Sequence, residues 1–574
     1  MKMNRNPWVI NAEYLADEEI KEYFIDDDKY LSELKDNESY LIEGCRGSGK
    51  TMLMKYSELE LLENFDTLRV LPIYVSFADS LKLDRYKVID NSIKDDIFIR
   101  WSVSKIIKEL IETYIKKLNY DIDMSSSFNR FFKVNSYEEI IQDLPNFINE
   151  LEVIKDDIDI DNISSTYELL WNKTVDITYF KQFINEFIQK HDISNIIFYF
   201  DEAAHTLFPY QQELFFTIFK KLKSSNIACK ASVYPLITHY GNDFQPSQDA
   251  KKIIVDKDDE NSTLIDFFKK FYDKRIENDD KKDILKNNLQ DEKIFKTIIY
   301  ASSGNPRRFL QLIDKFRYEK LVKSKLITII RNHSSNELWE YHQKLIQGNL
   351  DLRGYAEVGR KFIEEYVIPK LQDANKRSRQ NNKKVRSISI ELETNNDFKK
   401  MIKTLEYSGI LDYKKDLKTR GDNNANYYTL NLALCFAENI LEVEDIGNTD
   451  LRRGTSLTAN SPTVKDYTKK ILELFSSNCP KCEKKIDTNN HKFCPNCGNN
   501  LENIENVFEK MLSHSIDSLK IQLVGDIIEE RLKNKFQSIK DLMDAEDNEV
   551  MKIQAVGTKR LEYIKIAIRD YISG

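Results

Sequence analysis

The feature that most constrains this chain is an eight-residue loop between an apolar run and a helix-like segment. The loop is Gly44-Cys45-Arg46-Gly47-Ser48-Gly49-Lys50-Thr51 and fits the pattern G-x-x-x-x-G-K-[ST] in full. It follows Tyr40-Leu41-Ile42 and precedes Met52-Leu53-Met54, so we expect a strand, the loop and a helix in that order. Glycines at these spacings let backbone N–H groups turn toward phosphates, and the helix N-terminus adds a favourable dipole. The loop predicts nucleotide binding; the alternative is a glycine-rich turn before an ordinary helix.

The polar positions of the loop have separate expected roles. The Lys50 ammonium would reach the β- and γ-phosphates and act in catalysis, and the Thr51 hydroxyl would sit on Mg²⁺. ATP and Mg²⁺ are therefore the expected cofactors. The predicted nucleotide-binding residues are Gly44, Cys45, Arg46, Gly47, Ser48, Gly49, Lys50, Thr51, Met52 and Asp201.

Asp201 and Glu202 follow the apolar and aromatic run Asn195-Ile196-Ile197-Phe198-Tyr199-Phe200. Such a run is typical of a strand buried on both faces of a parallel sheet. Its carboxyl end lies where ligands bind in open α/β folds. We expect Asp201 to hold Mg²⁺ and Glu202 to orient the attacking water as a catalytic residue. A helix N-cap pair is the alternative for an isolated Asp-Glu dipeptide; together with the loop, the pair predicts hydrolysis.

Composition limits the classes that remain. The chain has 574 residues, of which 41% are hydrophobic and 31% charged, and a net charge of −8, which predicts several soluble domains. No apolar run is long enough for a membrane span, and no secretory signal follows Met1, so we expect a cytoplasmic protein without a membrane partner. The wealth of Asn, Lys and Ile is typical of an AT-rich bacterial genome. Because the balance is acidic, contact with nucleic acid must come from local patches.

Strand and helix patterns alternate around these motifs. A strand is expected over 68–75, toward a sheet edge because Pro72 cannot donate to a ladder. Residues 90–190 have a helical pattern, and a helix over about 209–224 and a strand over 227–234 follow Glu202. Ser232, at the end of that strand, is a candidate catalytic residue facing the γ-phosphate; a surface serine at a strand end is the alternative.

The turn Gly304-Asn305-Pro306-Arg307-Arg308 stops one helix and opens the next. With the loop and the Asp-Glu strand, it makes residues 1–325 resemble the AAA+ ATPases, in particular the origin-recognition and replication-initiator branch. The resemblance implies that Arg307 is the sensor of a helical lid and reaches the γ-phosphate. The family's trans-acting arginine finger has no clear counterpart, and Arg275 is the nearest candidate. STAND-type signalling ATPases share the loop and the aspartate strand, so the clade stays open.

Residues 387–432 resemble a winged-helix domain, which in replication-initiator ATPases follows the lid and grips duplex DNA. A strand over 387–390, a helix from Asp397 to Leu405 and a hairpin with a charged tip over 414–426 carry the resemblance. Protein docking is the alternative use of such a domain. The polar stretch 374–386 predicts a solvated loop or a phosphate contact. The wing residues implied by the resemblance are Lys414, Lys415, Lys418 and Arg420.

Four of the seven cysteines form two C-x-x-C pairs, Cys479 with Cys482 and Cys494 with Cys497. Two intervening residues let one tight turn present both thiolates to a tetrahedral ion, and a cytosolic chain disfavours disulfides. The segment resembles a zinc ribbon and predicts a structural Zn²⁺ without an open ligand position. A redox dithiol and an iron–sulfur site are the alternatives.

The last stretch of the chain repeats one pattern, in which residues 521–525 and 553–557 each precede a helix. It resembles a tandem helix-hairpin-helix domain, whose hairpin N–H groups grip DNA phosphates. The first hairpin glycine of that family is replaced by Leu523 in one copy and by Ala555 in the other. Residues 501–574 hold 11 lysines and arginines and 14 aspartates and glutamates, so DNA binding and protein docking or dimerisation are equally open.

These patterns predict an α/β fold: a P-loop NTPase parallel sheet with a helical lid, then winged-helix, zinc-ribbon and all-α helix-hairpin-helix domains. One functional hypothesis is an AAA+-type ATPase that engages DNA, as a homo-oligomer, in bacterial antiphage or mobile-element defence or in genome maintenance. The other is a STAND-like switch that recruits a protein effector with little turnover. The predicted domains are the ATPase core (1–250, with a helical insertion over 90–190), lid (251–345), winged helix (350–445), linker (446–473), zinc ribbon (474–503) and helix-hairpin-helix tail (508–574).

Overall fold

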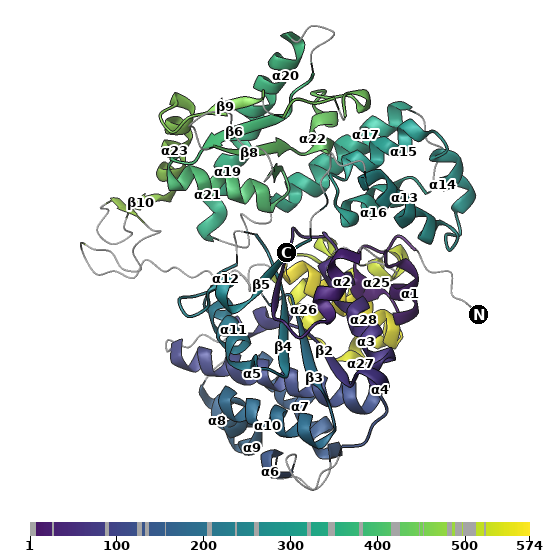
Figure 1. Cartoon of the computed structure of the whole chain (residues 1–574), viewed down its shortest axis with the longest axis vertical. Helices are drawn as coiled ribbons and strands as arrows, with labels where there is room; N and C mark the ends of the chain where they lie inside the picture. The colour runs from purple at the N-terminus through teal and green to yellow at the C-terminus, as the bar shows by residue number, and fades with distance from the viewer. Residues whose placement is uncertain are drawn as a thin grey trace.

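The computed structural model describes residues 7–573 apart from short gaps (Figure 1). Within the described residues, every helix is too short or too polar to cross a bilayer. The gaps are residues 26–27, 86–90, 123–128, 133–136, 155–156, 204–208, 236–237, 256, 258–262, 318–322, 343–349, 378–382, 415–424, 447, 452, 479–484, 488–495, 497–511, 520 and 522–523.

The centre of the lower lobe in Figure 1 is a five-stranded sheet of order β2-β3-β4-β1-β5. All neighbouring strands pair in parallel, so their carboxyl ends meet along one edge of the sheet. Pro72 lies in β2, at the sheet edge, as its missing N–H predicts. The α/β class with a parallel sheet is therefore confirmed. The strands are β1 (Tyr40–Glu43), β2 (Val70–Ser76), β3 (Asn195–Asp201), β4 (Ile227–Val233) and β5 (Lys251–Ile254).

Helices cover the sheet on both faces, and β3 and β4 are almost wholly buried as a result. The region predicted to be helical does lie between β2 and β3. The ring centre of Phe77, just after β2, lies 5.6 Å from that of Trp101 in α5, so this region packs against the sheet. Phe77 also lies 5.2 Å from Phe215 in α11. The helices here are α1 (Asp17–Tyr23), α2 (Asp28–Lys35), α3 (Lys50–Glu63), α4 (Phe65–Leu68), α5 (Asn91–Glu112), α6 (Asn129–Phe132), α7 (Tyr137–Val153), α8 (Asp157–Thr166), α9 (Glu168–Thr174), α10 (Ile177–Lys190), α11 (Pro209–Leu222) and α12 (Pro246–Asp249).

A second group of helices, the helical unit, follows β5. Its interior holds Arg317, which donates to both carboxylate oxygens of Asp279 at 2.9 and 2.7 Å. Trp8, from the start of the chain, donates to the same carboxylate and packs in the same apolar core. The helical unit consists of α13 (Thr263–Ile276), α14 (Lys282–Asn288), α15 (Glu292–Ala301), α16 (Pro306–Lys315), α17 (Lys323–His333) and the short helix Ser334–Trp339.

Residues 350–475, the mixed-sheet unit, form the top of the molecule in Figure 1. A four-stranded sheet of order β7-β8-β6-β9 packs against helices here, and the strand–helix–hairpin order is the one expected over 387–432. Of the predicted wing residues, Lys414 is described and the others lie outside the described residues. The elements are α19 (Leu350–Phe362), α20 (Ile368–Arg377), β6 (Ser387–Glu391), α21 (Asn396–Tyr407), β7 (Leu411–Tyr413), β8 (Ala425–Leu430), α22 (Leu432–Ala437), β9 (Thr455–Leu457) and α23 (Pro462–Phe475).

The segment 446–473, predicted as a linker, is folded. Its strand β9 pairs with β6, and α23 buries Val464, Tyr467 and Ile471 in the shared core. These residues follow one helix face, a signal hidden by the polar residues between them.

Among its described residues, the end of the chain contains a short hairpin, four α-helices and one turn of 3-10 helix (Ile516–Ser518). The hairpin pairs β10 (Ser476–Asn478) with β11 (Lys485–Asp487). The tail, residues 512–573, has an apolar core that also takes in Val9 and Tyr14 from the start of the chain. Tail residues and residues of α5 and α7 line one cavity of about 450 Å³, so the tail lies against the helices that follow β2. Its helices are α25 (Asp526–Lys535), α26 (Ile539–Asp544), α27 (Asp547–Met551) and α28 (Thr558–Ser573).

Candidate functional site

The predicted phosphate loop joins β1 to the first residue of α3. Gly47 and Gly49 have φ values of +83° and +103°, a region that side chains rarely adopt. Lys50 is buried, and its ammonium donates to the carbonyl oxygens of Gly44 at 2.7 Å and Cys45 at 3.1 Å. The Lys50 side chain thus points toward the loop, at the place where phosphates would bind.

Asp201 ends β3 next to the loop and accepts hydrogen bonds on both carboxylate oxygens. Thr51 Oγ1 and the Tyr74 hydroxyl donate to Oδ2 at 2.7 and 2.8 Å. Ser232 Oγ, from the neighbouring strand β4, donates to Oδ1 at 2.6 Å. The structure thus brings together Thr51, Asp201 and Ser232, all predicted from the sequence. A carboxylate beside a hydroxyl is the kind of oxygen ligand set that Mg²⁺ takes in nucleotide sites.

Glu202 has a strained backbone, with a φ of +61°, and such strain is concentrated at functional sites. Its amide N–H donates to Asp201 Oδ1 at 3.0 Å and to Ser232 Oγ at 3.1 Å. Burial, followed by the nearby charge of Asp201, raises the pKa of the Glu202 carboxyl to about 7. A carboxyl with a pKa near neutrality can exchange a proton with water at physiological pH.

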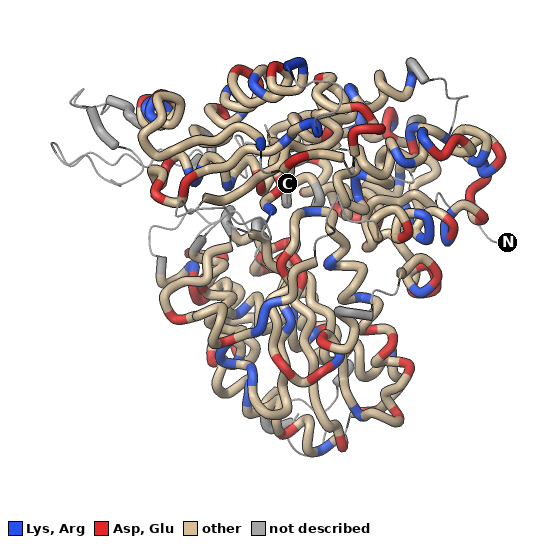
Figure 2. The backbone as a smooth tube through the Cα atoms, turned by 45° about the horizontal axis from the view of Figure 1, so that its top comes forward, with Lys and Arg blue, Asp and Glu red and all other residues tan. Residues whose placement is uncertain are grey.

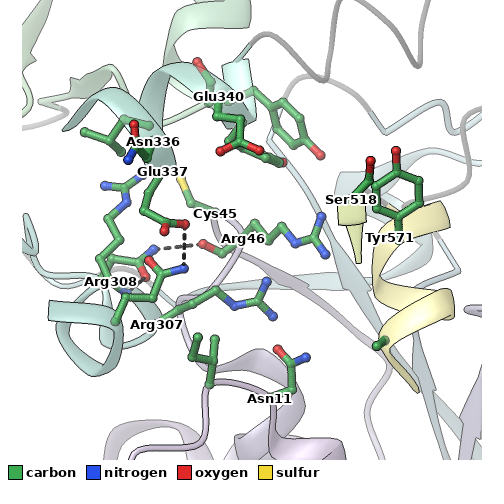
Figure 3. A pocket seen from close by; sticks show the side chains of 18 residues that line it. Asn11, Cys45, Arg46, Arg307, Arg308, Asn336, Glu337, Glu340, Ser518 and Tyr571 are labelled. Carbon is green, nitrogen blue, oxygen red and sulfur yellow. Dashed lines mark hydrogen bonds between the residues drawn. The ribbon is translucent and has the colours of Figure 1, made fainter. Parts of the chain in front are cut away.

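The predicted lid turn contacts the phosphate loop directly (Figure 3). Asn305 Nδ2 donates to the Arg46 carbonyl at 2.8 Å, and the Arg307 amide donates to the Gly47 carbonyl at 3.3 Å. Asn305 also caps α16 by accepting from the Arg308 amide. A Cβ on Gly47 would lie 2.5 Å from the Arg307 Cβ, so the close approach of the turn requires glycine there.

A cavity of about 160 Å³ opens beside the loop. Its lining combines the loop from Arg46 to Thr51 and Glu202 with a set of apolar and aromatic side chains, the apolar wall. Such a wall suits a nucleobase. The wall comes from the start of the chain and from α13 and α16, and its residues include Val9, Ile10, Tyr23, Phe24, Phe267, Phe271 and Leu310.

Arg275 does not form a trans-acting finger, so that expectation is wrong. Its side chain is buried, donates to the Tyr23 carbonyl at 3.2 Å and lies 3.9 Å from the centre of the Phe271 ring. Burial lowers the pKa of its guanidinium to about 9. An arginine enclosed by its own chain cannot reach a neighbouring subunit.

The sequence analysis missed two tyrosines and one segment of the site. Tyr74 donates to Asp201, and Tyr234 lies beside Glu202 and Lys50. Tyr234 comes two residues after Ser232, so the strand-end rule that selected Ser232 could have found it as well. The segment Val9–Glu13, which lines the cavity, carries no motif, and only tertiary packing reveals it.

The predicted zinc ligands Cys479, Cys482, Cys494 and Cys497 lie outside the described residues. Among the residues that the structure does describe, no group of three or more His, Cys, Asp and Glu side chains could hold a metal ion. The cysteines that are described, Cys45, Cys229 and Cys435, take part in no disulfide bond.

The parallel sheet, the loop after its strand β1 and the cluster around Asp201 define a nucleotide-binding α/β protein of the P-loop class. The chain belongs to the ORC-CDC6-like family, whose model matches residues 9–428, well beyond the 1–325 expected from the motifs. No curated protein matches the sequence.

Two solved structures from Aeropyrum pernix are similar to this chain. The ORC1 protein in complex with DNA has 13% identity, covers 78% of this chain and 99% of its own, and gives a TM-score of 0.33. The ORC2 protein, in ADPNP and ADP complexes, has 11% identity, covers 73% of this chain and 91% of its own, and gives a TM-score of 0.24.

Proposed function

We propose that this chain is a Mg²⁺-dependent ATPase of the AAA+ type whose C-terminal modules engage DNA. The observation that carries the proposal is the contact of Thr51 with Asp201 at the mouth of the phosphate loop, with Glu202 beside it. Membership of the ORC-CDC6-like family supports the same class.

Within this proposal, the chain's own residues divide the work of binding. Lys50 leaves the carbonyls of Gly44 and Cys45 to bind the β- and γ-phosphates, while the glycine loop supplies backbone N–H groups. Thr51 and Asp201 are the residues that would hold Mg²⁺. The ion, when bound, neutralises charge that develops on the phosphates.

Hydrolysis is assigned to Glu202. Its raised pKa, near 7, keeps the carboxyl close to balance between its two protonation states, as a water-orienting base requires. Ser232 forms hydrogen bonds with both the Asp201 carboxylate and the Glu202 amide. These contacts support a place for Ser232 beside the γ-phosphate. The Arg307 amide donates to the Gly47 carbonyl of the phosphate loop. This contact supports the role of Arg307 as the sensor of lid position.

Contact with DNA is assigned to local patches because acidic and basic residues are interspersed over the chain (Figure 2). In the second predicted hairpin, Thr558 and Lys559 are exposed, so its helix N-terminus and a cation face solvent together. The predicted wing beyond Lys414 is the other patch. A zinc ribbon over 474–503, homo-oligomerisation and a role in bacterial antiphage defence or genome maintenance remain parts of the proposal.

The test is ATP hydrolysis by the purified protein with and without duplex DNA. Lys50→Ala is the blank, and Glu202→Gln should retain bound ATP without turning it over. Stimulation by DNA supports the DNA-coupled ATPase. Wild-type turnover in the Glu202→Gln protein would remove the water-orienting role, and turnover in Lys50→Ala would remove the site itself.

A second function, an ATP-dependent switch that recruits a protein effector, is favoured by the first predicted hairpin. Ile527 is 68% exposed at the start of α25, close to the acidic residues Glu529 and Glu530, and this combination suits a protein partner better than DNA. The salt dependence of binding distinguishes the two functions. Affinity for DNA falls steeply as the salt concentration rises, whereas affinity for a protein docked on Ile527 does not.

A further inference from the structure

The strongest unassigned feature is a row of tyrosines between Glu202 and the mixed-sheet unit. It begins at the catalytic candidate, where the Tyr234 hydroxyl lies 3.4 and 3.5 Å from the two carboxylate oxygens of Glu202. The face of the same ring lies 4.0 Å from the Lys50 ammonium. Tyr234 therefore touches both the residue assigned to hydrolysis and the residue assigned to phosphate binding.

The row continues into the mixed-sheet unit. The Tyr234 ring meets the edge of Tyr407 at a centroid distance of 6.2 Å and an interplanar angle of 81°, a favourable geometry for two aromatic rings. Tyr407 is the last residue of α21. Both side chains are almost completely buried, at 3% and 2% exposure, so the contact between the two rings lies inside the protein and is shielded from water.

The row then returns to the phosphate loop. Tyr407 lies 6.1 Å from Tyr341, and the Arg46 guanidinium lies 5.8 Å from the centre of the Tyr341 ring, within reach of a cation–π contact. Tyr341, Tyr407 and Arg46 line a cavity of about 200 Å³ between the loop, the helical unit and the tail (Figure 3). The path thus starts at Glu202 and ends at the loop, passing through the mixed-sheet unit.

The residues next in sequence anchor the row. Ser408 follows Tyr407 and His342 follows Tyr341; their side chains form a hydrogen bond of 2.8 Å, and both are fully buried. His342 Nε2 lies 2.8 Å from the Ala356 carbonyl in α19. The end of α21 and the segment after the helical unit are therefore one rigid joint, and a shift of the mixed-sheet unit must carry Tyr407 with it.

We infer that Tyr234 is a positioning residue for Glu202, and that Tyr407 couples the placement of the mixed-sheet unit to it. The inference rests on the proposed ATPase and deepens it, since DNA held by the predicted wing would then act on hydrolysis through these rings. The hydroxyl distinguishes the inference from ordinary core packing: phenylalanine would fill the same space at Tyr234 without holding the carboxylate.

Two substitutions and one control test the inference. Tyr234→Phe removes only the hydroxyl and should lower kcat several-fold while changing the affinity for ATP by less than twofold. Tyr407→Leu should retain ATP affinity and abolish stimulation by duplex DNA. Tyr467→Leu is the matched control, because Tyr467 is a buried tyrosine of the same unit that packs on Phe362 and not on the row; its stimulation by DNA should equal that of the wild type.

Amide hydrogen exchange supplies a readout that does not need hydrolysis. Tyr407→Leu should speed exchange in the peptides that cover residues 195–203 and 231–235, whereas Tyr467→Leu should leave them unchanged. Unchanged exchange there in Tyr407→Leu, or wild-type stimulation by DNA in that variant, would overturn the coupling. A wild-type protein that hydrolyses ATP but ignores DNA also overturns it. If the wild type has no turnover while exchange still responds to Tyr407→Leu, the ATPase proposal fails and the physical link between the two sites stands.

Discussion

At the mouth of the phosphate loop the polar side chains turn inward onto one another, whereas in the tail those of the second predicted hairpin turn outward. Asp201 accepts from three hydroxyls within 2.8 Å, and the site is completed by strands far apart in the sequence. In the tail, Thr558 and Lys559 face solvent at the start of one helix. The first arrangement fixes geometry for chemistry, and the second leaves groups open for a partner. A change in one region should therefore spare the other.

The largest expected effect is in the nucleotide site. Lys50→Ala removes the ammonium assigned to the β- and γ-phosphates, which in the structure donates to the carbonyls of Gly44 and Cys45. We expect nucleotide affinity to fall at least about 100-fold, since a charged hydrogen-bonding group is lost from a buried site. Fluorescent ATP titration measures the loss. DNA affinity without nucleotide should be unchanged; a parallel loss of DNA binding would show that the two regions are not separate.

Removal of zinc should affect the end of the chain and spare the nucleotide site. A small module without a sizeable core depends on its metal for folding, so a zinc-selective chelator should unfold residues 474–503 and release about one Zn²⁺ per chain if four thiolates share one ion. Nucleotide affinity should persist. Metal analysis and ATP titration of the same sample test this, and a chain purified without zinc contradicts the ligand assignment.

Tyr14→Ala tests the contact between the start of the chain and the tail. Tyr14 is 4% exposed and packs on the Tyr563 ring at 5.3 Å, and truncation of a buried aromatic side chain costs about 3 kcal/mol. We expect faster hydrogen exchange in α28, with nucleotide affinity changed less than threefold. Tyr14→Phe, which keeps the ring, is the matched control. An equal effect from both variants would assign the contact to the hydroxyl.

Lys559 and Arg560 test the outward-facing region. Substitution of both by alanine should weaken duplex binding several-fold without regard to sequence. The slope of log affinity against log salt should fall by roughly one for each phosphate that the protein no longer neutralises. ATP hydrolysis without DNA should be unchanged. Unaltered DNA binding together with loss of a protein partner would favour the effector-recruiting switch.

The smallest expected effect is at Ala555. Its φ of +75° is unfavourable for a residue with a Cβ, by roughly 1–2 kcal/mol, and it occupies the position at which the helix-hairpin-helix family has glycine. Ala555→Gly should stabilise the tail by up to about 1 kcal/mol, since greater freedom in the unfolded chain offsets part of the relieved strain. Thermal unfolding monitored in the tail measures the gain.

The sequence predicts those parts of the site that depend on local pattern. The strands ending at Glu43, Asp201 and Val233 are expected within a few residues. A continuous apolar run marks the first two as buried parallel strands, whereas the third also contains Lys230 and Ser232. Residues 47 and 49 of the phosphate loop have positive φ values, which glycine adopts most easily. The spacing of the glycines in the sequence therefore predicts the shape of the loop.

The parts that the sequence does not predict depend on packing between distant elements. The contact between Tyr234 and Tyr407 exists only because the fold brings the end of β4 next to the end of α21. The sequence cannot tell an arginine at a subunit boundary from one enclosed by its own chain, as Arg275 is by Tyr23 and Phe271. The segment after Asp445 reads as a linker because the pairing of β9 with β6 joins residues that are far apart.

The packing of Val9 and Tyr14 against the tail also has a consequence for protein synthesis. Tyr14 and its partner Tyr563 are 549 residues apart, so at ribosomal rates of about 5–20 residues per second the first waits roughly 30–110 seconds for the second. During that time Val9, which lines the nucleotide cavity, lacks the tail surface against which Val9 and Tyr14 finally pack. Val9, one of the residues that line the nucleotide cavity, therefore gains its final packing partners only when the last helix has left the ribosome.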